Sequence, residues 1–561
     1  MINRVLGLVR PVDIPGDSVL RLLIKVAGIA LLYLGLAHTA EAQTGPWTTQ
    51  GPSNCSDQYG SFDAFIPGMR GFGSCNRGGF VPNTNVIIVT NRNATGTGSL
   101  HAALTAGCPK VIIFNVGGLI ARGGRTITTN CNQWSLVGAS APGQVVYGGT
   151  DSGPLVNPRG NNWTIDHMIF AAGDESWFAG PTSNRDSINL GNAPTDVNQG
   201  HAILMNNTII WGFDAGIDCY PNLSSPFRSW QRVLFWQNII GVGLGIGHSG
   251  GVMTSNPSCA DVNIIRTAYV HSNERAPNIR ADGWFLSNNL HANINRDVAQ
   301  ISTCLQTGHP YDSPTRMMGI HSLVAKSNTS DSNQGYLENP GGSGCTPHQV
   351  YEEGIRVRET NGTVRNCANH SCSGGRDPFN SSVWQSSPIT SIYPTGYVPE
   401  TIPATQAGIE AFADQVLTYV GSRPLNRLPY IQARVIDEAT GMVNGSDTSS
   451  TFGETNPAPL PGRWSSIPLE GGISQITPAN TSWTVTNQCG GMPTGAAADS
   501  IQSSGLTGLH EWVIGCFYDN VMPGGYREDG LQNYPAPGGG GSGPPPPPPP
   551  PRPNPPEWGV G

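Results

Sequence analysis

Short apolar runs of strand length recur between about residues 86 and 364. Each run is bounded by Gly, Asn, Asp or Ser, and no helical periodicity of comparable extent interrupts the series. A doubly wound α/β sheet needs a helix between strands, so this pattern argues against it. Repeated short strands joined by polar turns predict a solenoid, with a β-sandwich or a propeller as the alternatives. The runs are VIIVT, VIIFNV, WSLVG, WTIDHMIF, AILMNNTII, RVLFWQNII, VNIIRTAYV, GWFLSNNL and GIHSLVAK.

Asparagine recurs just before or inside many of these runs, as at Asn207, Asn238, Asn263 and Asn289. We expect these side chains to stack at a recurring corner of the solenoid and to satisfy backbone groups there. Two helices are expected outside the runs. One, over residues 98–104, would cover the open N-terminal end of the solenoid, and the other, over residues 405–420, would pack across the later coils.

The composition indicates a turn-rich β protein with little charge. Of its 561 residues, 73 are Gly and 47 are Pro, only 12% are charged, and the net charge is −8. No global basic field exists to attract nucleic acid or acidic lipid, so we expect no nucleic-acid partner. A polyanionic partner would have to be bound by a local group of cations. We also expect the protein to be a monomer.

The first 42 residues are predicted to be a signal peptide. An apolar run over residues 26–37 follows several basic residues and precedes Ala40-Glu41-Ala42, a small-x-small cleavage pattern. A retained signal anchor is the alternative, but the run is short for a membrane span of about 20 residues. We therefore expect a secreted, extracellular protein with no membrane attachment after cleavage.

All twelve cysteines follow this leader, and an even number in an exported chain predicts disulfides. Zinc is the alternative, but no C-x-x-C pair occurs. The organisation predicted is a solenoid domain over residues 43–456, an extension over 457–534 in which Cys489 and Cys516 form a local disulfide, and a Gly/Pro-rich tail over 535–561 that could attach the protein to a cell wall. Glycosylation is expected in a eukaryotic source, at sequons that include Asn93, Asn222, Asn328, Asn361, Asn444 and Asn480.

Several ordered segments resemble the pectate lyase superfamily of polysaccharide lyases, in its divergent secreted branch. The resemblance extends from about residue 64 to residue 445, and it implies an all-β fold. The expected architecture is a right-handed parallel β-helix with an N-terminal capping helix, followed here by the disulfide-bearing C-terminal extension. The opening segments that carry the resemblance are FIPGMRGFG, VIIVTNRNATGTGSLHAAL, VIIFNVGG and SLVGASAPG.

The resemblance implies a calcium site made of three carboxylates. In the family, calcium held by acidic residues contacts the uronate carboxylate, and it stabilises the charge that develops when the neighbouring C5 proton leaves. The family's first acidic ligand matches Asp186 in the string Asp-Ser-Ile, and the second and third match Asp214 and Asp218 in DAGID. Calcium is a hard cation that takes six to eight oxygen ligands, so it suits such a site.

The resemblance also implies roles for two arginines and a histidine. The family's R-x-P-x-x-R motif is complete, which makes Arg275 the base and Arg280 a substrate-binding residue. His248, in a Gly-His-Ser string found in relatives, either binds substrate or only turns the chain. Arginines in general keep their proton up to about pH 12, so an alkaline medium would favour the neutral base. The alternative is that both arginines only pair with carboxylates or carbonyls.

Two departures from the family pattern affect the predicted site. A lysine that grips the uronate in many members should fall between residues 241 and 248, but after the leader the chain has only Lys110 and Lys326. The family's W-I-D-H string resembles the segment ending in Asp166 and His167, which precedes Asp186 and so belongs to an earlier coil. We therefore interpret His167 as structural.

The sequence thus predicts a secreted lyase that cleaves a uronate-containing acidic polysaccharide through calcium-assisted β-elimination. The expected substrate is pectate. A β-helical protein that binds glycan without cleaving it is one alternative, because the lysine is missing. A glycoside hydrolase on the same fold is the other, with Asp214 and Asp218 as paired acids, although the arginine motif argues against it.

Overall fold

The computed structural model describes the chain in segments between residues 55 and 518. The chain divides into two compact units between Gly51 and Pro52, and every described residue belongs to the second. The predicted signal peptide, the boundary at residue 456 and the Gly/Pro-rich tail lie outside these segments. The described residues are 55–148, 153–172, 186–190, 200–212, 215–219, 230–241, 250–254, 259–272, 275–279, 283–294, 298–301, 316–326, 336–338, 349–367, 384–422, 430–446, 484–485 and 491–518.

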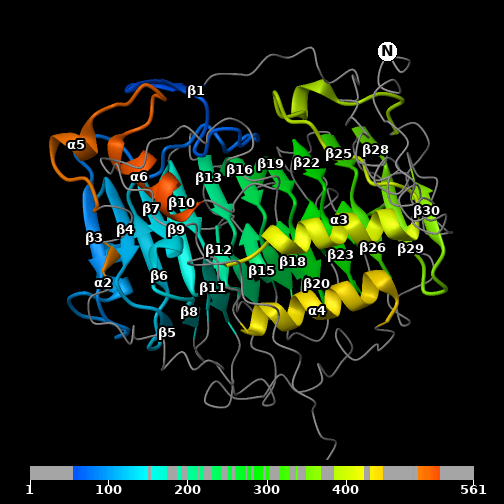
Figure 1. The fold of residues 1–561 in the computed structure, drawn as a ribbon, viewed down its shortest axis with the longest axis horizontal. Coiled ribbons are helices and arrows are strands. Elements are labelled where there is room, and N and C mark those ends of the chain that lie inside the picture. The colour runs from blue at the N-terminus through cyan, green and yellow to red at the C-terminus, as the bar shows by residue number, and fades with distance from the viewer. Residues whose placement is uncertain are drawn as a thin grey trace, which may run out of the picture. The chain divides into compact units, whose positions relative to one another are not determined.

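Three sheets contain nearly all the described strands, and Figure 1 shows them side by side along the molecule. Sheet I consists of β3 (Asn85–Val89), β4 (Lys110–Phe114), β7 (Trp134–Val137), β10 (Trp163–Asp166), β13 (Gly200–Met205), β16 (Trp230–Trp236), β19 (Cys259–Ile265), β22 (Trp284–Ser287), β25 (Arg316–Ile320) and β28 (Gln349–Glu353). Sheet II consists of β5 (Gly118–Ala121), β8 (Val145–Gly148), β11 (Met168–Ala171), β14 (Thr208–Ile210), β17 (Ile239–Gly241), β20 (Ala268–Val270), β23 (Leu290–Ala292), β26 (Leu323–Ala325), β29 (Ile355–Arg358) and β30 (Val364–Cys367). Sheet III consists of β6 (Ile127–Asn130), β9 (Val156–Arg159), β12 (Ile188–Asn189), β15 (Ala215–Cys219), β18 (Gly250–Thr254), β21 (Asn278–Ile279), β24 (Ala299–Ile301) and β27 (Leu337–Glu338). A small hairpin, β1 (Cys55–Asp57) and β2 (Gly60–Phe62), precedes them.

The chain visits the three sheets in turn, so that three successive strands make one coil. From β7 to β26, each strand pairs in parallel with the strand one coil further along the chain, as β7 with β10 and β10 with β13. Only β30 pairs antiparallel among the strands described for the three sheets. Stacked parallel sheets of this kind form a parallel β-helix, which confirms the predicted solenoid; its right hand stays a prediction.

Most of the apolar runs contain two strands each, not one as their length suggested. WTIDHMIF, for example, divides into β10 and β11 at His167, which has a left-handed φ of 48°. The same left-handed turn from sheet I to sheet II occurs at Asn206 (φ 51°), Gln237 (φ 53°) and Asn288 (φ 53°). Because sheets I and II are buried on both faces, the run stays apolar through the corner and only the corner residues are polar.

The asparagine that follows the left-handed residue at Asn206, Gln237 and Asn288 binds one coil to the coil before it. The Asn238 side chain accepts from the backbone N–H of Asn207 at 2.9 Å and donates to the Leu204 carbonyl at 2.8 Å. Asn289 repeats the pattern, accepting from the N–H of Thr267 at 2.8 Å and donating to the carbonyl of Ile264 at 2.9 Å. The predicted asparagine corner is confirmed at these positions. Asn263 was wrongly included, since it lies on sheet I and accepts from the N–H of Phe72.

A glycine-rich segment, residues 64–81, lies across the outer face of sheet I; we call it the N-terminal strap. Asn76 in this strap donates to the carbonyls of Trp163 at 2.8 Å and of His201 at 2.6 Å. A Cβ on Gly79 would lie 1.8 Å from the Lys110 carbonyl oxygen, and one on Gly73 would lie 2.7 Å from the Ala202 carbonyl oxygen. Glycine is therefore required because the strap backbone touches the sheet backbone directly.

Residues 491–518, which we call the C-terminal clasp, contact the strap and the first coils. They include α5 (Ala496–Asp499) and α6 (Gly508–Phe517), at the site of the short helix suggested by the sequence. His510 stacks on Phe80 with ring centroids 4.2 Å apart, and Arg77 donates to the Gly505 carbonyl. Burial, with a smaller effect of Arg77, holds the pKa of His510 well below its usual range.

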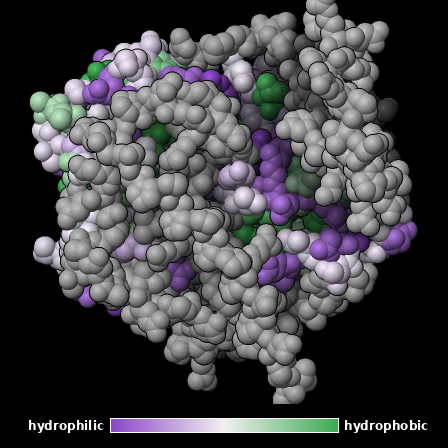
Figure 2. Space-filling view, in the orientation of Figure 1, coloured by the Kyte–Doolittle hydropathy of each residue, from purple (hydrophilic) through white to green (hydrophobic). Residues whose placement is uncertain are grey.

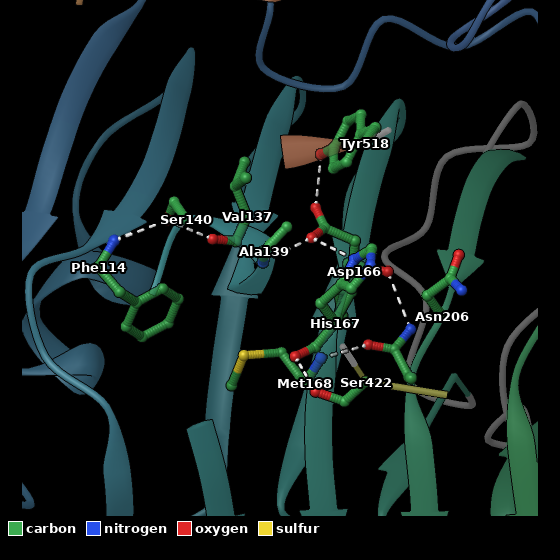
Figure 3. A network of polar contacts seen from close by, with 12 residues as sticks. Phe114, Val137, Ala139, Ser140, Asp166, His167, Met168, Asn206, Ser422 and Tyr518 are labelled. Atoms are coloured by element: carbon green, nitrogen blue, oxygen red, sulfur yellow. Dashed lines mark hydrogen bonds and ion pairs between the residues drawn. The ribbon is translucent and has the colours of Figure 1, made fainter. Parts of the chain in front are cut away.

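A buried carboxylate joins the clasp to the coils (Figure 3). Asp166 accepts from the Tyr518 hydroxyl at 2.7 Å, from the Ala139 N–H at 3.0 Å and from His167 Nδ1 at 3.1 Å. The Ser422 hydroxyl donates to the His167 carbonyl at 2.5 Å. Since His167 is buried at this junction, its contacts support a structural role.

Helices cover the outer face of sheet II (Figure 1). The helix expected over residues 405–420 is present as α3 (Gln406–Tyr419), and a second helix, α4 (Tyr430–Asn444), lies beside it. Apolar residues of both helices form one cluster with outward residues of sheet II such as Ile239 and Leu290. The other expected helix is α2 (Leu100–Thr105), capped by the Ser99 hydroxyl, and its buried Leu100 and Leu104 belong to the core inside the coils.

Every cysteine whose side chain the structure describes is disulfide-bonded, which supports disulfides over zinc. The partner Cys489 predicted for Cys516 lies outside the described residues. The bonded cysteines are Cys55 with Cys75, Cys108 with Cys131, and also Cys219, Cys367 and Cys516.

Little large apolar surface is exposed on the described part of the protein. Val398 and Ile501 are the large hydrophobic side chains that remain exposed there. On the face in Figure 2, the coloured surface is a mixture of hydrophilic and intermediate residues with small apolar areas between them. None of the described helices is long and apolar enough to span a membrane.

Replacing Gly79 with alanine tests the contact between the strap and sheet I. The new Cβ would overlap the Lys110 carbonyl, so we expect Gly79→Ala to lower the free energy of unfolding by about 3 kcal/mol. Gly107→Ala is the matched control, because a Cβ there meets no atom within 4 Å, and it should change stability by less than about 0.5 kcal/mol. Urea denaturation of both variants measures the difference, and equal stabilities would contradict the contact.

A buried histidine makes the fold sensitive to acid. His291 stacks on Tyr269 inside the coils, with ring centroids 4.9 Å apart, and burial lowers its pKa to about 3. Between that value and about 6.5, its pKa when unfolded, the unfolded chain binds one more proton, so stability falls as the pH falls through this window. We expect His291→Phe to reduce the slope of unfolding free energy against pH by about 1.4 kcal/mol per pH unit, measured by denaturation between pH 6 and pH 4. An unchanged slope would contradict this assignment.

Candidate functional site on sheet III

Sheet III differs from the other two sheets in having a polar outer side. Its inward residues, such as Ile188, Ile217 and Ile279, belong to the core, and the residues between them point outward. Strand register aligns one outward residue from each of β9, β12, β15, β18, β21 and β24 in a line. The residue from β18 is the apolar Met253, and we call the five polar residues the polar row: Asn157, Asn189, Asp218, Asn278 and Gln300.

Asp218 occupies the middle of the polar row. It lies in β15 and is only 6% exposed. Asn189, directly opposite in β12, donates from Nδ2 to Asp218 Oδ2 at 3.3 Å. The carboxylate is thus presented on the outer side of the sheet but is largely removed from water.

Asp186 lies two residues before β12 and is almost completely buried. Its Oδ1 accepts from the backbone N–H of Ala215 at 3.1 Å, at the start of β15. Asp186 therefore fixes the segment that leads into the strand bearing Asp218. If Asp186 also binds a metal ion, its carboxylate must do so while accepting this backbone hydrogen bond.

Arg275 lies three residues before β21, beside the first residues of β18. Its carbonyl accepts from the N–H of Gly251 at 3.1 Å, and a cis Ala276–Pro277 bond follows it. Its φ is 63°, but His167 and Asn206 share this conformation, so the backbone alone does not distinguish Arg275. The side chain is half-buried.

Of the predicted residues that the structure describes, Asp218 lies on sheet III, and Asp186 and Arg275 precede strands of the same sheet. Strands in a sheet are about 4.8 Å apart, so β21 lies about 10 Å from β15 and about 14 Å from β12. Asp214, Arg280 and His248 lie outside the described residues.

The described donors agree with calcium in kind, because they are carboxylate and amide oxygens. Asp218 and the amide of Asn189 lie together in the polar row. Within the described segments, however, no three acidic, histidine or cysteine residues form a group that could hold a metal ion. Since Asp214 is not described, the three-carboxylate set stays a prediction.

Relatives of the chain are found among fungal pectate lyases. It is 26% identical over 229 residues to probable pectate lyase C of Aspergillus fumigatus, and 25% identical over the same length to that of Neosartorya fischeri. This region is 40% of the chain and 46% of each relative. The chain is a distant homologue of the pectate lyases. The resemblance deduced from the motifs is thereby confirmed, although the match spans less than half the length of these relatives.

Comparison with solved structures gives only weak matches, and comparison with family models gives none. The cedar-pollen allergen Jun a 1 aligns at 15% identity with a TM-score of 0.42, covering 63% of this chain and 92% of the allergen. A pectate lyase from Bacillus sp. N165, solved in complex with trigalacturonate, aligns at 13% identity with a TM-score of 0.37, covering 64% of this chain and 100% of that one. No family model matches. The fold assignment therefore rests on the strand pairing.

Neither of the two described lysines reaches the polar row. Lys110 Nζ donates to the carbonyls of Leu104 at 2.6 Å and Ala106 at 2.7 Å, at the C-terminal end of α2, and burial lowers its pKa to about 8. Lys326 Nζ lies 3.2 Å from Glu359 Oε2 at the far end of sheet II. Neither Lys110 nor Lys326 is therefore placed to replace the substrate-binding lysine expected from the family resemblance.

Sequence reasoning missed the polar row, apart from Asp218. The signal was present as short alternations in which one polar residue stands beside or between apolar ones, the pattern of a strand with one buried face. Each alternation is too short to be recognised alone, and only the register shows that they align. The segments are VNP (156–158), INL (188–190), IDC (217–219), PNI (277–279) and AQI (299–301).

The contact between Asp186 and β15 predicts a structural effect of its removal. We expect Asp186→Ala to lower the free energy of unfolding by about 1–3 kcal/mol, because the buried N–H of Ala215 loses its acceptor. Asp186→Asn keeps a carbonyl oxygen at this position, and it should cost less. Thermal and urea unfolding compare the two, and an alanine variant as stable as the unaltered protein would show that the contact contributes nothing.

Proposed function

We propose that this chain is a secreted polysaccharide lyase that cleaves a uronate-containing polysaccharide, with pectate as the expected substrate, through calcium-assisted β-elimination. The observation that carries the proposal is that Asp218 lies in the polar row of sheet III and Arg275 just precedes β21, two strands along the same sheet, in a chain distantly homologous to pectate lyases. Disulfides throughout the described part support an extracellular location.

Each predicted site residue has a role in the proposed reaction. Asp186, Asp214 and Asp218 would hold calcium, which when bound stabilises negative charge beside the substrate carboxylate. Arg275 takes the C5 proton, the C4–O bond breaks, and the C–H electron pair forms the C4=C5 double bond. The leaving oxygen takes a proton from solvent. Arg280 and His248 orient the uronate, and the half-buried position of Arg275 supports its place next to the sugar.

Glycan binding without cleavage is the second candidate function. The contacts of both mature lysines favour it, because Lys110 and Lys326 are committed to structural partners away from sheet III. A lyase without the usual lysine would have to bind the substrate carboxylate through calcium and arginine alone. A glycoside hydrolase would instead require Asp214 and Asp218 as the acid pair.

Reaction products separate these functions. The full-length secreted protein is incubated with polygalacturonate and calcium at alkaline pH. Elimination produces an unsaturated sugar that absorbs in the ultraviolet, whereas hydrolysis produces reducing ends without a double bond. We expect the unsaturated product. Reducing ends alone would indicate a hydrolase, and binding with no product would indicate a lectin-like protein.

Changing the proposed base tests its role within the lyase. Arg275→Lys keeps a positive charge but alters the geometry of the base, and we expect turnover to fall by about 10²- to 10⁴-fold with calcium binding retained. Arg159→Lys is the matched control, since Arg159 is a half-buried arginine of β9 on the same sheet. Unchanged turnover in Arg275→Lys would reject Arg275 as the base.

A further inference from the structure

We propose that Asn189 is a positioning residue that holds the carboxylate of Asp218 in place for the cation. This inference rests on the proposed function, because it concerns the calcium site of the lyase. Asn189 belongs to none of the motifs that carry the family resemblance, and it is identified by its contact with Asp218 alone.

Strand register places the two side chains together. Asn189 and Asp218 are directly opposite in the parallel pair β12 and β15. Their flanking residues, Leu190 next to one and Ile217 next to the other, point into the core, so both polar side chains must point outward. Residues opposite each other on neighbouring strands have Cβ atoms about 5 Å apart, a spacing that the 3.3 Å contact between Nδ2 and Oδ2 bridges.

The kind of donor determines what Asn189 can do. Asp218 is only 6% exposed, and a carboxylate removed from water is costly unless it accepts hydrogen bonds. A lysine or arginine opposite Asp218 would supply such bonds but would also neutralise its charge. An amide donates while leaving the negative charge intact. Asn189 therefore fixes the direction of Asp218 and preserves the charge that attracts a divalent cation.

Partners that orient a metal ligand commonly contribute 10- to 100-fold to metal affinity. We expect Asn189→Leu, a change of similar size that removes the donor, to weaken calcium binding by about that factor. Because the buried Asp218 carboxylate also loses a hydrogen bond, the melting temperature should fall as well. Asn157→Leu is the matched control. It replaces a buried asparagine of the same polar row, two strands from Asp218, and should leave calcium affinity unchanged.

A double-mutant cycle separates positioning from a general structural effect. Calcium affinity of the full chain is measured by calorimetry and, for weak binders, by the calcium-dependent rise in melting temperature. If Asn189 acts through Asp218, Asn189→Leu causes no further loss in an Asp218→Asn background. Equal affinity of Asn189→Leu and the unaltered protein, or the same loss in both backgrounds, would overturn the inference. Absence of calcium binding by the unaltered protein would instead overturn the proposed lyase mechanism, and the inference with it.

Discussion

Hydrogen bonding between successive coils is the constraint on which the rest of this structure depends. A coil of three short strands cannot satisfy its own backbone, so each strand takes its partners from the coils before and after it. At the corners, the side chains of Asn207, Asn238 and Asn289 add further hydrogen bonds between coils to those of the backbone. Register is thus fixed in every coil, and residues far apart in sequence form straight rows.

The candidate site follows from what covers each sheet. The N-terminal strap and the C-terminal clasp cover sheet I, and α3 and α4 cover sheet II, so the outward residues of these sheets contribute to packing. Sheet III has a row of amides around Asp218 instead. Because the register is fixed, the strand that bears Asp218 and the strand that follows Arg275 are two coils apart in the same sheet.

The sequence predicted the architecture better than its details. Strand-length runs and corner asparagines predicted stacked coils, since both depend on local pattern, and Ser99 marked α2 correctly. The left-handed turns inside the runs were missed because sheets I and II are apolar on both sides of the corner. The strap was recognised only as a family-like segment. Its contact with sheet I depends on backbone approach at Gly79, which no periodicity reveals.

The site itself was only partly predictable. Motifs identified Asp186, Asp218 and Arg275; Asp218 lies on sheet III, the other two precede strands of that sheet, and their roles stay predictions. The motifs gave no indication that Asp186 is bound to the backbone of Ala215, or that Asn189 faces Asp218. Both facts depend on which coil stacks on which, information that a single segment of sequence does not contain. The second covering helix, α4, was missed as well, although Val435, Ile436 and Ala439 form an apolar stripe at helical spacing.

The hydrogen bond between Tyr518 and Asp166 affects how the protein can fold while it is being synthesised. The two residues are separated by 352 positions, and ribosomes add roughly 5–20 residues per second. The earliest coils therefore emerge tens of seconds before the residues that cover them, with apolar side chains such as Phe65 and Phe80 still lacking the ring of His510. During this interval the first-formed coils lack part of their cover, so a region synthesised late completes one synthesised early.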